Sequence, residues 1–130
     1  EVIDLASEEF DPALRFGYRQ RMHEEACTKT RQELLQRCDQ AALAFPVWWA
    51  GEPSLLKGWF DRVLTPGNAY RYLSGNSFKW LLTGRSTTLI ATSHAPAWYA
   101  RLHPANPISR IARHILGNCG IKVTQRLTFG

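Results

Sequence analysis

The chain has 130 residues, of which 45% are hydrophobic and 21% are charged. This balance is typical of a globular protein, and the length is sufficient for one domain but not for two. No apolar run is long enough to span a bilayer, and no charged-then-apolar signal segment opens the chain. We therefore expect a cytoplasmic protein without membrane insertion.

The formal net charge of +5 suits an anionic small ligand or nucleic acid. The basic residues are scattered, however, so a solvated surface is favoured over a nucleic-acid-binding face. The three cysteines (Cys27, Cys38 and Cys119) and the four histidines lack the spacing of metal ligands. This pattern favours reduced thiols and predicts no metal site.

The first half of the chain predicts strand, helix, strand and helix. Residues 2–5 read as the end of a strand, and residues 23–39 favour a helix with a thin apolar stripe. Residues 41–48 are apolar on both faces, as expected for a buried parallel strand. Ser54 is a suitable N-cap for a helix that runs to residue 64 and ends before Pro66-Gly67, while Asp61 and Arg62 are expected to form a solvated pair.

The second half continues the same alternation. Residues 65–80 are interpreted as a loop that is functional or forms an interface, and residues 87–92 as a second buried strand. Asn106 is predicted to cap a strongly periodic helix that Gly120 ends. Residues 121–129 complete the pattern as a last strand. Strands alternating with helices indicate an α/β fold with a parallel sheet and right-handed crossovers.

Several motifs resemble those of the flavodoxin-fold NAD(P)H:quinone oxidoreductases. Phe45-Pro-Val-Trp-Trp49, followed by Pro53-Ser-Leu-Leu-Lys-Gly-Trp-Phe-Asp-Arg-Val63, is the longest and most specific of them. Ala69-Tyr-Arg-Tyr72 is similar to that family's Ala-Tyr-x-Tyr loop. Thr92 to Tyr99 and Cys119-Gly120 follow in the same order, so the resemblance extends over nearly the whole chain.

The resemblance implies a flavodoxin-like three-layer sandwich with a parallel sheet in the order 2-1-3-4-5. The first strand of that order, with its phosphate-binding loop, has no counterpart in this sequence, and neither has the closing helix. We therefore expect residues 1–130 to form a single flavodoxin-like domain that is incomplete at both ends. A chain of this length alone would bind flavin weakly or not at all.

The resemblance also implies a function. Hydride would pass from NAD(P)H to a bound flavin and then to a quinone by a ping-pong mechanism. The flavin would be FAD, as in mammalian-type members, or alternatively FMN, as in many bacterial relatives. The protein would be a homodimer with its active site at the subunit boundary.

Site residues are carried over position by position from the family's motifs. The flavin-binding positions are Val47, Trp48, Trp49, Ala50, Ala91, Thr92, Ser93, His94 and Tyr99. The catalytic candidates are Tyr99 and His103, of which His103 is out of register with the family. The quinone-binding candidates are Tyr70, Arg71, Tyr72 and Trp49.

Elementary chemistry is compatible with these roles but does not require them. Neighbours on a strand point to opposite faces, so Trp49 is favoured beside the flavin and Trp48 is expected to contribute mainly its backbone. The backbone N–H groups of residues 47–50 are suited to the polar edge of a flavin. Tyr99 is suited to donate a hydrogen bond to the negatively charged reduced flavin. The alternative for each aromatic residue is ordinary packing.

Three other functions stay open at the level of sequence. The first is a flavodoxin-type electron carrier, although such carriers are usually acidic and this chain is basic. The second is a regulatory ancillary subunit of a potassium efflux system, which some relatives resemble. The third is a fragment without activity.

Overall fold

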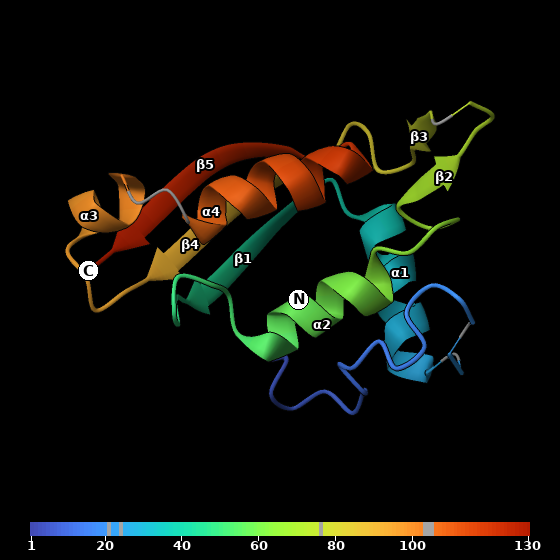
Figure 1. The fold of residues 1–130 in the computed structure, drawn as a ribbon, viewed down its shortest axis with the longest axis horizontal. Helices are drawn as coiled ribbons and strands as arrows, with labels where there is room; N and C mark the ends of the chain where they lie inside the picture. Colours follow the sequence, from blue (N-terminus) through green and yellow to red (C-terminus); the bar gives the residue numbers. More distant parts are fainter. Residues whose placement is uncertain (21, 24, 76, 103–105) are drawn as a thin grey trace.

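The computed structural model describes residues 1–20, 22–23, 25–75, 77–102 and 106–130. At its centre lies a parallel sheet of three strands: β1 (Gln40–Pro46), β4 (Ser86–Thr92) and β5 (Lys122–Phe129). The strands lie in the order β1-β4-β5, with β4 in the middle (Figure 1). The parallel α/β architecture predicted from the sequence is therefore confirmed.

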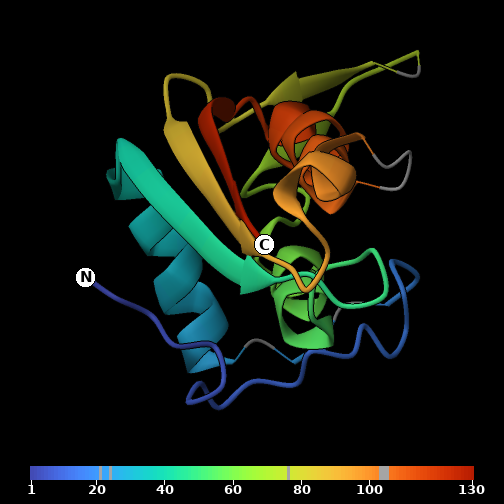
Figure 2. The ribbon, with the colours of Figure 1, turned by 90° about the vertical axis from the view of Figure 1, so that its left-hand side faces the viewer.

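The helices gather on one side of this sheet, as Figures 1 and 2 show. They are α1 (Ala26–Arg37), α2 (Ser54–Val63) and a C-terminal helix that begins as α4 (Pro107–Arg110). That last helix continues through a π-helical segment, Ile111–Leu116, and a 3-10 turn, Gly117–Cys119. No helix within the described ranges is long and apolar enough to cross a membrane.

One core joins the helices to one face of the sheet. Phe45, Leu89 and Ala91 point from the strands toward Phe60 of α2 and Ile111 of the C-terminal helix, and all five are buried. The other face of β1 is open to solvent at Ala42 and Ala44. The expectation that this strand is buried on both faces is wrong, because the described helices cover only one side and β1 is an edge of the three-stranded sheet.

Residues 2–5 do not form the predicted strand. The Asp4 side chain accepts a hydrogen bond from the Ala6 amide at 3.0 Å, and the Asp4 carbonyl accepts one from the Ser7 amide at 3.0 Å. A strand needs a neighbour to take its backbone hydrogen bonds, and here a local turn takes them instead.

Arg62 fastens the N-terminal segment to α2. Its side chain is 5% exposed, and its guanidinium lies 3.5 Å from the Glu25 carboxylate and donates to the Asp11 carbonyl at 2.7 Å. The predicted solvated pair of Asp61 with Arg62 is therefore wrong, since Lys57 binds Asp61 at 2.6 Å. Beside this anchor, Gly58 leaves space for the chain: a Cβ there would lie 2.4 Å from the Cβ of Pro12.

The helix boundaries agree with the sequence in part. Asn106 caps α4 as predicted, because its side chain accepts a hydrogen bond from the Ile108 amide at 2.9 Å. Gly120 follows the last helical turn with a φ of 88°, a conformation that favours glycine. Ser54, in contrast, is the first residue of α2, and Pro53 occupies the cap position without a side-chain hydrogen bond.

Two elements lie where the sequence predicted none. Residues 65–80 contain an antiparallel hairpin of β2 (Tyr70–Tyr72) and β3 (Phe78–Trp80) rather than a loop. Its Tyr-Arg-Tyr and Phe-Lys-Trp sequences do alternate, but three residues are too few to distinguish a strand by periodicity. A short helix, α3 (Ala97–Leu102), follows β4.

The three cysteines are free thiols in different surroundings, which leads to a first testable prediction. Cys119 is 3% exposed, and burial raises the pKa of its thiol to about 11, whereas Cys27 and Cys38 are partly exposed. Because the thiolate is the reactive form, we expect Cys119 to react with a thiol reagent at pH 8 roughly a hundredfold more slowly than an ordinary thiol.

Mass spectrometry after timed labelling measures this difference site by site. In denaturant all three thiols should react at similar rates, which controls for local sequence effects. Rapid labelling of Cys119 in the folded protein would contradict its placement in the core.

Candidate functional site

The carboxyl ends of the three parallel strands are held together by backbone hydrogen bonds. The Val47 amide, just after β1, donates to the Thr92 carbonyl of β4 at 2.7 Å. The Ser93 amide, just after β4, donates to the Phe129 carbonyl of β5 at 2.8 Å. The loops that leave these strands therefore meet at one edge of the sheet, where open α/β sheets bind their ligands.

The chain makes a strained turn as it leaves β1. The amide of Trp48 donates to the Gly51 carbonyl, and the amide of Gly51 donates to the Trp48 carbonyl, both at 2.9 Å. Between them Trp49 has a φ of 50° and Ala50 a φ of 58°. Positive φ at both central positions is the geometry of a type I′ turn, which normally uses glycine, asparagine or aspartate. A tryptophan and an alanine in this conformation each cost roughly 1–2 kcal/mol.

This strain gives a second testable prediction. Ala50→Gly should raise the free energy of unfolding by about 1 kcal/mol, because glycine adopts positive φ without steric cost. The matched control is Ala42→Gly on the exposed face of β1, which should lower it by about 0.5–1 kcal/mol through the usual entropic cost of glycine. Urea unfolding of both variants measures the two changes in the free energy of unfolding. A change in the same direction in both variants would contradict the strained turn.

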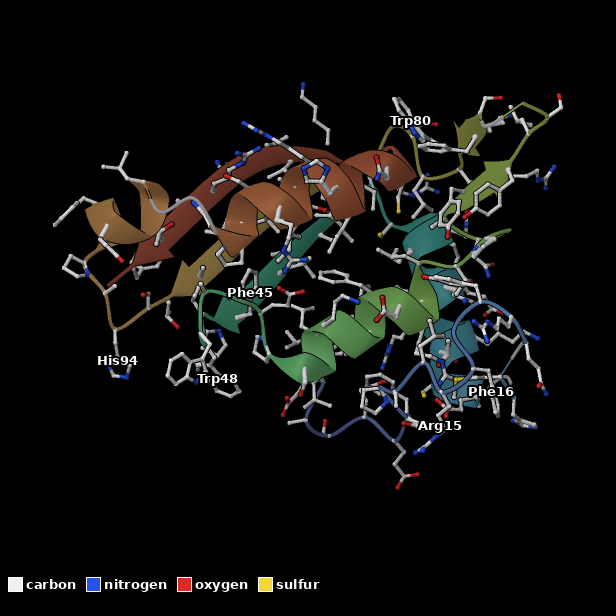
Figure 3. All side chains as sticks on the ribbon, viewed as in Figure 1. Arg15, Phe16, Phe45, Trp48, Trp80 and His94 are labelled. Carbon is white, nitrogen blue, oxygen red and sulfur yellow. The ribbon has the colours of Figure 1, made fainter. Side chains whose placement is uncertain are left out.

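The turn presents its side chains to solvent. The exposed fraction of Trp49 is 103%, and that of Trp48 is 62%. Neither tryptophan is a core residue, so packing does not explain them. In Figure 3, Trp48 lies at the same end of the molecule as His94, from the loop after β4, while Trp80 of the hairpin lies at the other end.

A cavity of about 700 Å³ lies between this turn and the loop after β4. We call it the strand-end cavity. The predicted flavin-binding residues that line it are Val47, Trp48, Trp49, Ala50, Ser93, His94 and Tyr99. Sequence reasoning missed Asn106, Pro107, Ile108 and Thr128, which also line it. Asn106 carried a usable signal, since a helix cap that follows a strand-end loop lies at that edge of the sheet.

The remaining predicted residues lie elsewhere. Ala91 is fully buried in the core, and Thr92 is exposed but outside the lining of the strand-end cavity. Tyr99 lies on α3 with an exposed fraction of 48%, edge-on to Trp98 with 5.9 Å between the ring centres. His103, the second catalytic candidate, falls outside the described residues.

The donors of the turn fit a flavin ring. The amides of Val47, Trp48 and Gly51 are taken by backbone carbonyls. Those of Trp49 and Ala50 bond no acceptor in the described part of the chain. A flavin ring has carbonyl and ring-nitrogen acceptors along one edge and a flat apolar face, which two free amides and an exposed indole complement. The cavity is also within the usual range for small-molecule sites.

Of the predicted quinone-binding residues, Trp49 lines the strand-end cavity, Tyr70 and Tyr72 line a second cavity, and Arg71 is in the lining of neither. Tyr70, Arg71 and Tyr72 form β2, and the two tyrosines line a space of about 360 Å³ between the hairpin, α2 and the C-terminal helix. We call this space the hairpin pocket. It shares no lining residue with the strand-end cavity, and Figure 1 shows the hairpin at the opposite end of the sheet from α3. Burial and hydrogen bonding to Tyr72 raise the pKa of Tyr70 well above its ordinary value.

Comparison with known proteins identifies the family to which this fold belongs. A model of the flavodoxin-like fold family matches residues 1–130. The chain belongs to this family. The match confirms the flavodoxin-like fold, and the resemblance to quinone oxidoreductases is confirmed by the names of similar proteins. One is FMN-dependent NADH:quinone oxidoreductase 1 of Bradyrhizobium diazoefficiens, 34% identical over 91 residues that span 68% of this chain and 39% of that protein.

Two solved structures are similar throughout much of the chain. The structure of Smu.1420 from Streptococcus mutans has a TM-score of 0.76 at 28% identity and covers 97% of this chain and 69% of that one. The structure of general stress protein 14 from Treponema denticola, in complex with FMN, has a TM-score of 0.59 at 29% identity. The match covers 78% of this chain and 59% of that one. The chain spans less than half the length of the curated relatives it matches.

Proposed function

We propose that this chain supplies the flavin-ring-binding part of an NAD(P)H:quinone oxidoreductase. The observation that carries the proposal is the strained turn beside the strand-end cavity, where Trp49 is fully exposed and the amides of Trp49 and Ala50 bond no acceptor among the described residues. Strain of this kind persists where a function requires the geometry. The names of similar proteins support the same class of enzyme.

FMN is favoured over FAD as the cofactor. The Bradyrhizobium relative is FMN-dependent by name, and the Treponema structure contains FMN. NAD(P)H would be the hydride donor and a quinone the acceptor, in two successive half-reactions that share one pocket.

A bound flavin would supply the hydride chemistry, and the residues of this chain would position it. The Trp49 and Ala50 amides would hold the ring by its acceptor edge while the indole of Trp49 covers part of the cavity. The Tyr99 hydroxyl would donate a hydrogen bond where negative charge develops on reduction. His94 is exposed on the same cavity wall and is suited to exchange a proton with solvent.

A homodimer would bring the two cavities into one site. Tyr70 and Tyr72 line a different cavity from Trp49 and Tyr99, so they would reach the same quinone only from a second copy of the chain. The hairpin exposes Tyr72, Leu73 and Trp80 by more than half each, an apolar surface of the kind that subunits cover. Sedimentation analysis of the protein tests this part of the proposal, and a monomer at all concentrations would contradict it.

Flavin binding is tested with a pair of aromatic variants. Trp49→Ala should weaken FMN binding about tenfold, which corresponds to the loss of one ring contact. Phe16→Ala is the control, because Phe16 is also an exposed aromatic residue but lies in the N-terminal segment and lines neither cavity, and it should bind FMN like the parent protein. Quenching of flavin fluorescence gives both affinities, and equal loss in both variants would contradict the assignment of the turn.

Measurements of flavin reduction distinguish an oxidoreductase from a flavodoxin-type electron carrier. The spectrum of the purified protein and chromatography of the released flavin identify the cofactor. Stopped-flow mixing with NADPH or NADH should then bleach the flavin absorbance, and a quinone should restore it. A flavin that NAD(P)H does not reduce would favour the carrier.

A further inference from the structure

We propose that the hairpin pocket binds flat aromatic molecules that carry an anionic oxygen group, such as a carboxylate or sulfonate. The inference rests on the proposed function only in that the ligand would be the electron acceptor; the binding itself follows from the aromatic and polar groups that line the pocket.

One wall of the hairpin pocket is aromatic. Tyr70 lies edge-on to Tyr72, with ring centres 5.5 Å apart, and edge-on to Phe78, with centres 6.4 Å apart. Tyr18 and Phe60 also line the space. Rings held at steep angles to one another offer both faces and edges to a flat ligand. The volume of about 360 Å³ is in the range of pockets that bind small organic molecules.

Polar side chains line the hairpin pocket beside these rings. Arg110, His114 and Asn118 follow at four-residue intervals along the C-terminal helix, which places them on one side of it. Lys57 of α2 also lines the pocket, and among the described residues Asp61 is the carboxylate that lines it. Lys57 donates to both carboxylate oxygens of Asp61, at 2.6 and 2.7 Å, so those two charges offset each other.

Arg110 is ion-paired as well, with Glu52, but it keeps N–H donors that face solvent. It is oriented by Glu52, whose side chain is only 3% exposed and binds a single guanidinium nitrogen, Nη2. The Arg110 side chain is 43% exposed, and its Nε and Nη1 bond no acceptor among the described residues. A guanidinium held on one side presents its other N–H donors as a fork that matches a carboxylate or sulfonate.

The aromatic rings and the polar groups of the pocket together favour a ligand that is both flat and anionic. A flat neutral ring would fill the aromatic side but would desolvate Arg110 and Asn118 without giving them acceptors. A cationic ring would give these donors no anionic acceptor either. An anionic ring satisfies both sides, and the net charge of +5 favours its approach.

Binding of a matched pair of probes tests the inference without flavin or NAD(P)H. We expect naphthalene-2-sulfonate to bind about tenfold more tightly than the neutral naphthalene-2-sulfonamide, as measured by calorimetry. The preference should decrease as salt concentration rises. Tyr72→Ala should weaken both probes by the same factor. Equal affinities of the two probes for the parent protein would overturn the proposal.

Variants of two arginines on the C-terminal helix test which residue causes the preference for the sulfonate probe. Arg110→Gln should abolish the preference for the sulfonate, whereas Arg113→Gln should retain it, because Arg113 is exposed and does not line the pocket. The double variant E52Q/R110Q removes the guanidinium without leaving the Glu52 carboxylate unpaired, so it tests the same point if the single variant is unstable. Persistence of the preference in the double variant, or its loss in Arg113→Gln, would overturn the proposal.

Turnover distinguishes this inference from the proposed function. With the flavin-loaded protein, 1,4-naphthoquinone-2-sulfonate should have a lower KM than 1,4-naphthoquinone, and E52Q/R110Q should remove that difference. Selective sulfonate binding without any NAD(P)H oxidation would refute the oxidoreductase and leave the pocket assignment supported. Turnover that shows no charge preference would refute the pocket assignment alone.

Discussion

Leu89→Ala should lower the free energy of unfolding by about 3–4 kcal/mol. Leu89 lies in the middle of β4, the central strand, and its exposed fraction is 0%. Its side chain belongs to the core formed by Phe45, Phe60 and Ile111. Truncation removes apolar contacts with both helices and strands and leaves a cavity, and close-packed surroundings collapse only partly into such a space.

Leu127→Ala is the matched control for Leu89→Ala. Leu127 lies on the neighbouring strand β5, paired with Ile90, and is 40% exposed. Its truncation should cost less than about 1 kcal/mol, because an exposed site leaves no cavity. Urea unfolding of the two variants gives the comparison. Similar losses would mean that the described face of the sheet is not the protein's principal core.

Arg62→Met should lower the free energy of unfolding by about 3 kcal/mol. Methionine keeps the apolar stem but removes the guanidinium that bonds the Asp11 carbonyl at 2.7 Å and the His23 carbonyl at 3.4 Å. It also leaves the Glu25 carboxylate without its cation. Buried acceptors without donors and a carboxylate without its partner are both unfavourable.

The matched control for Arg62→Met is Lys57→Met on the same helix. Lys57 forms an exposed pair with Asp61, and such pairs contribute about 1 kcal/mol or less. A second readout is limited trypsin digestion at Arg15 and Arg19, which should become faster in Arg62→Met alone because the N-terminal segment loses its anchor to α2. Stability losses within about 0.5 kcal/mol of each other in the two variants would contradict the buried role of Arg62.

Much of the fold near the central motif was predictable because its signals are local. The apolar run before Phe45 and the helical spacing after Ser54 each depend on residues a few positions apart. The same holds for the Asn106 cap and the Gly120 end of the C-terminal helix. The hairpin was not predictable in this way, since its two strands are only three residues long and pair with each other.

The residues of the candidate site were also predictable only in part. The resemblance pointed to residues 47–50 and to Ser93, His94 and Tyr99, and the structure brings these seven positions to one cavity. It also led to Ala91, which is a core residue, because motif matching does not distinguish a residue that faces a ligand from its neighbour on the strand. The lining of the hairpin pocket by Lys57, Arg110 and His114 had no signal in the sequence.

The sequence by itself determined the parallel α/β class, the central strand and helix, and the family to which the chain belongs. Only the tertiary structure decided three other features. These are the positive φ angles at Trp49 and Ala50, the burial of Arg62, and the separation of Tyr70 and Tyr72 from the strand-end cavity. The physical reason is that the last two depend on packing between segments distant in the chain, whereas the turn holds a tryptophan and an alanine in a conformation that their own preferences disfavour.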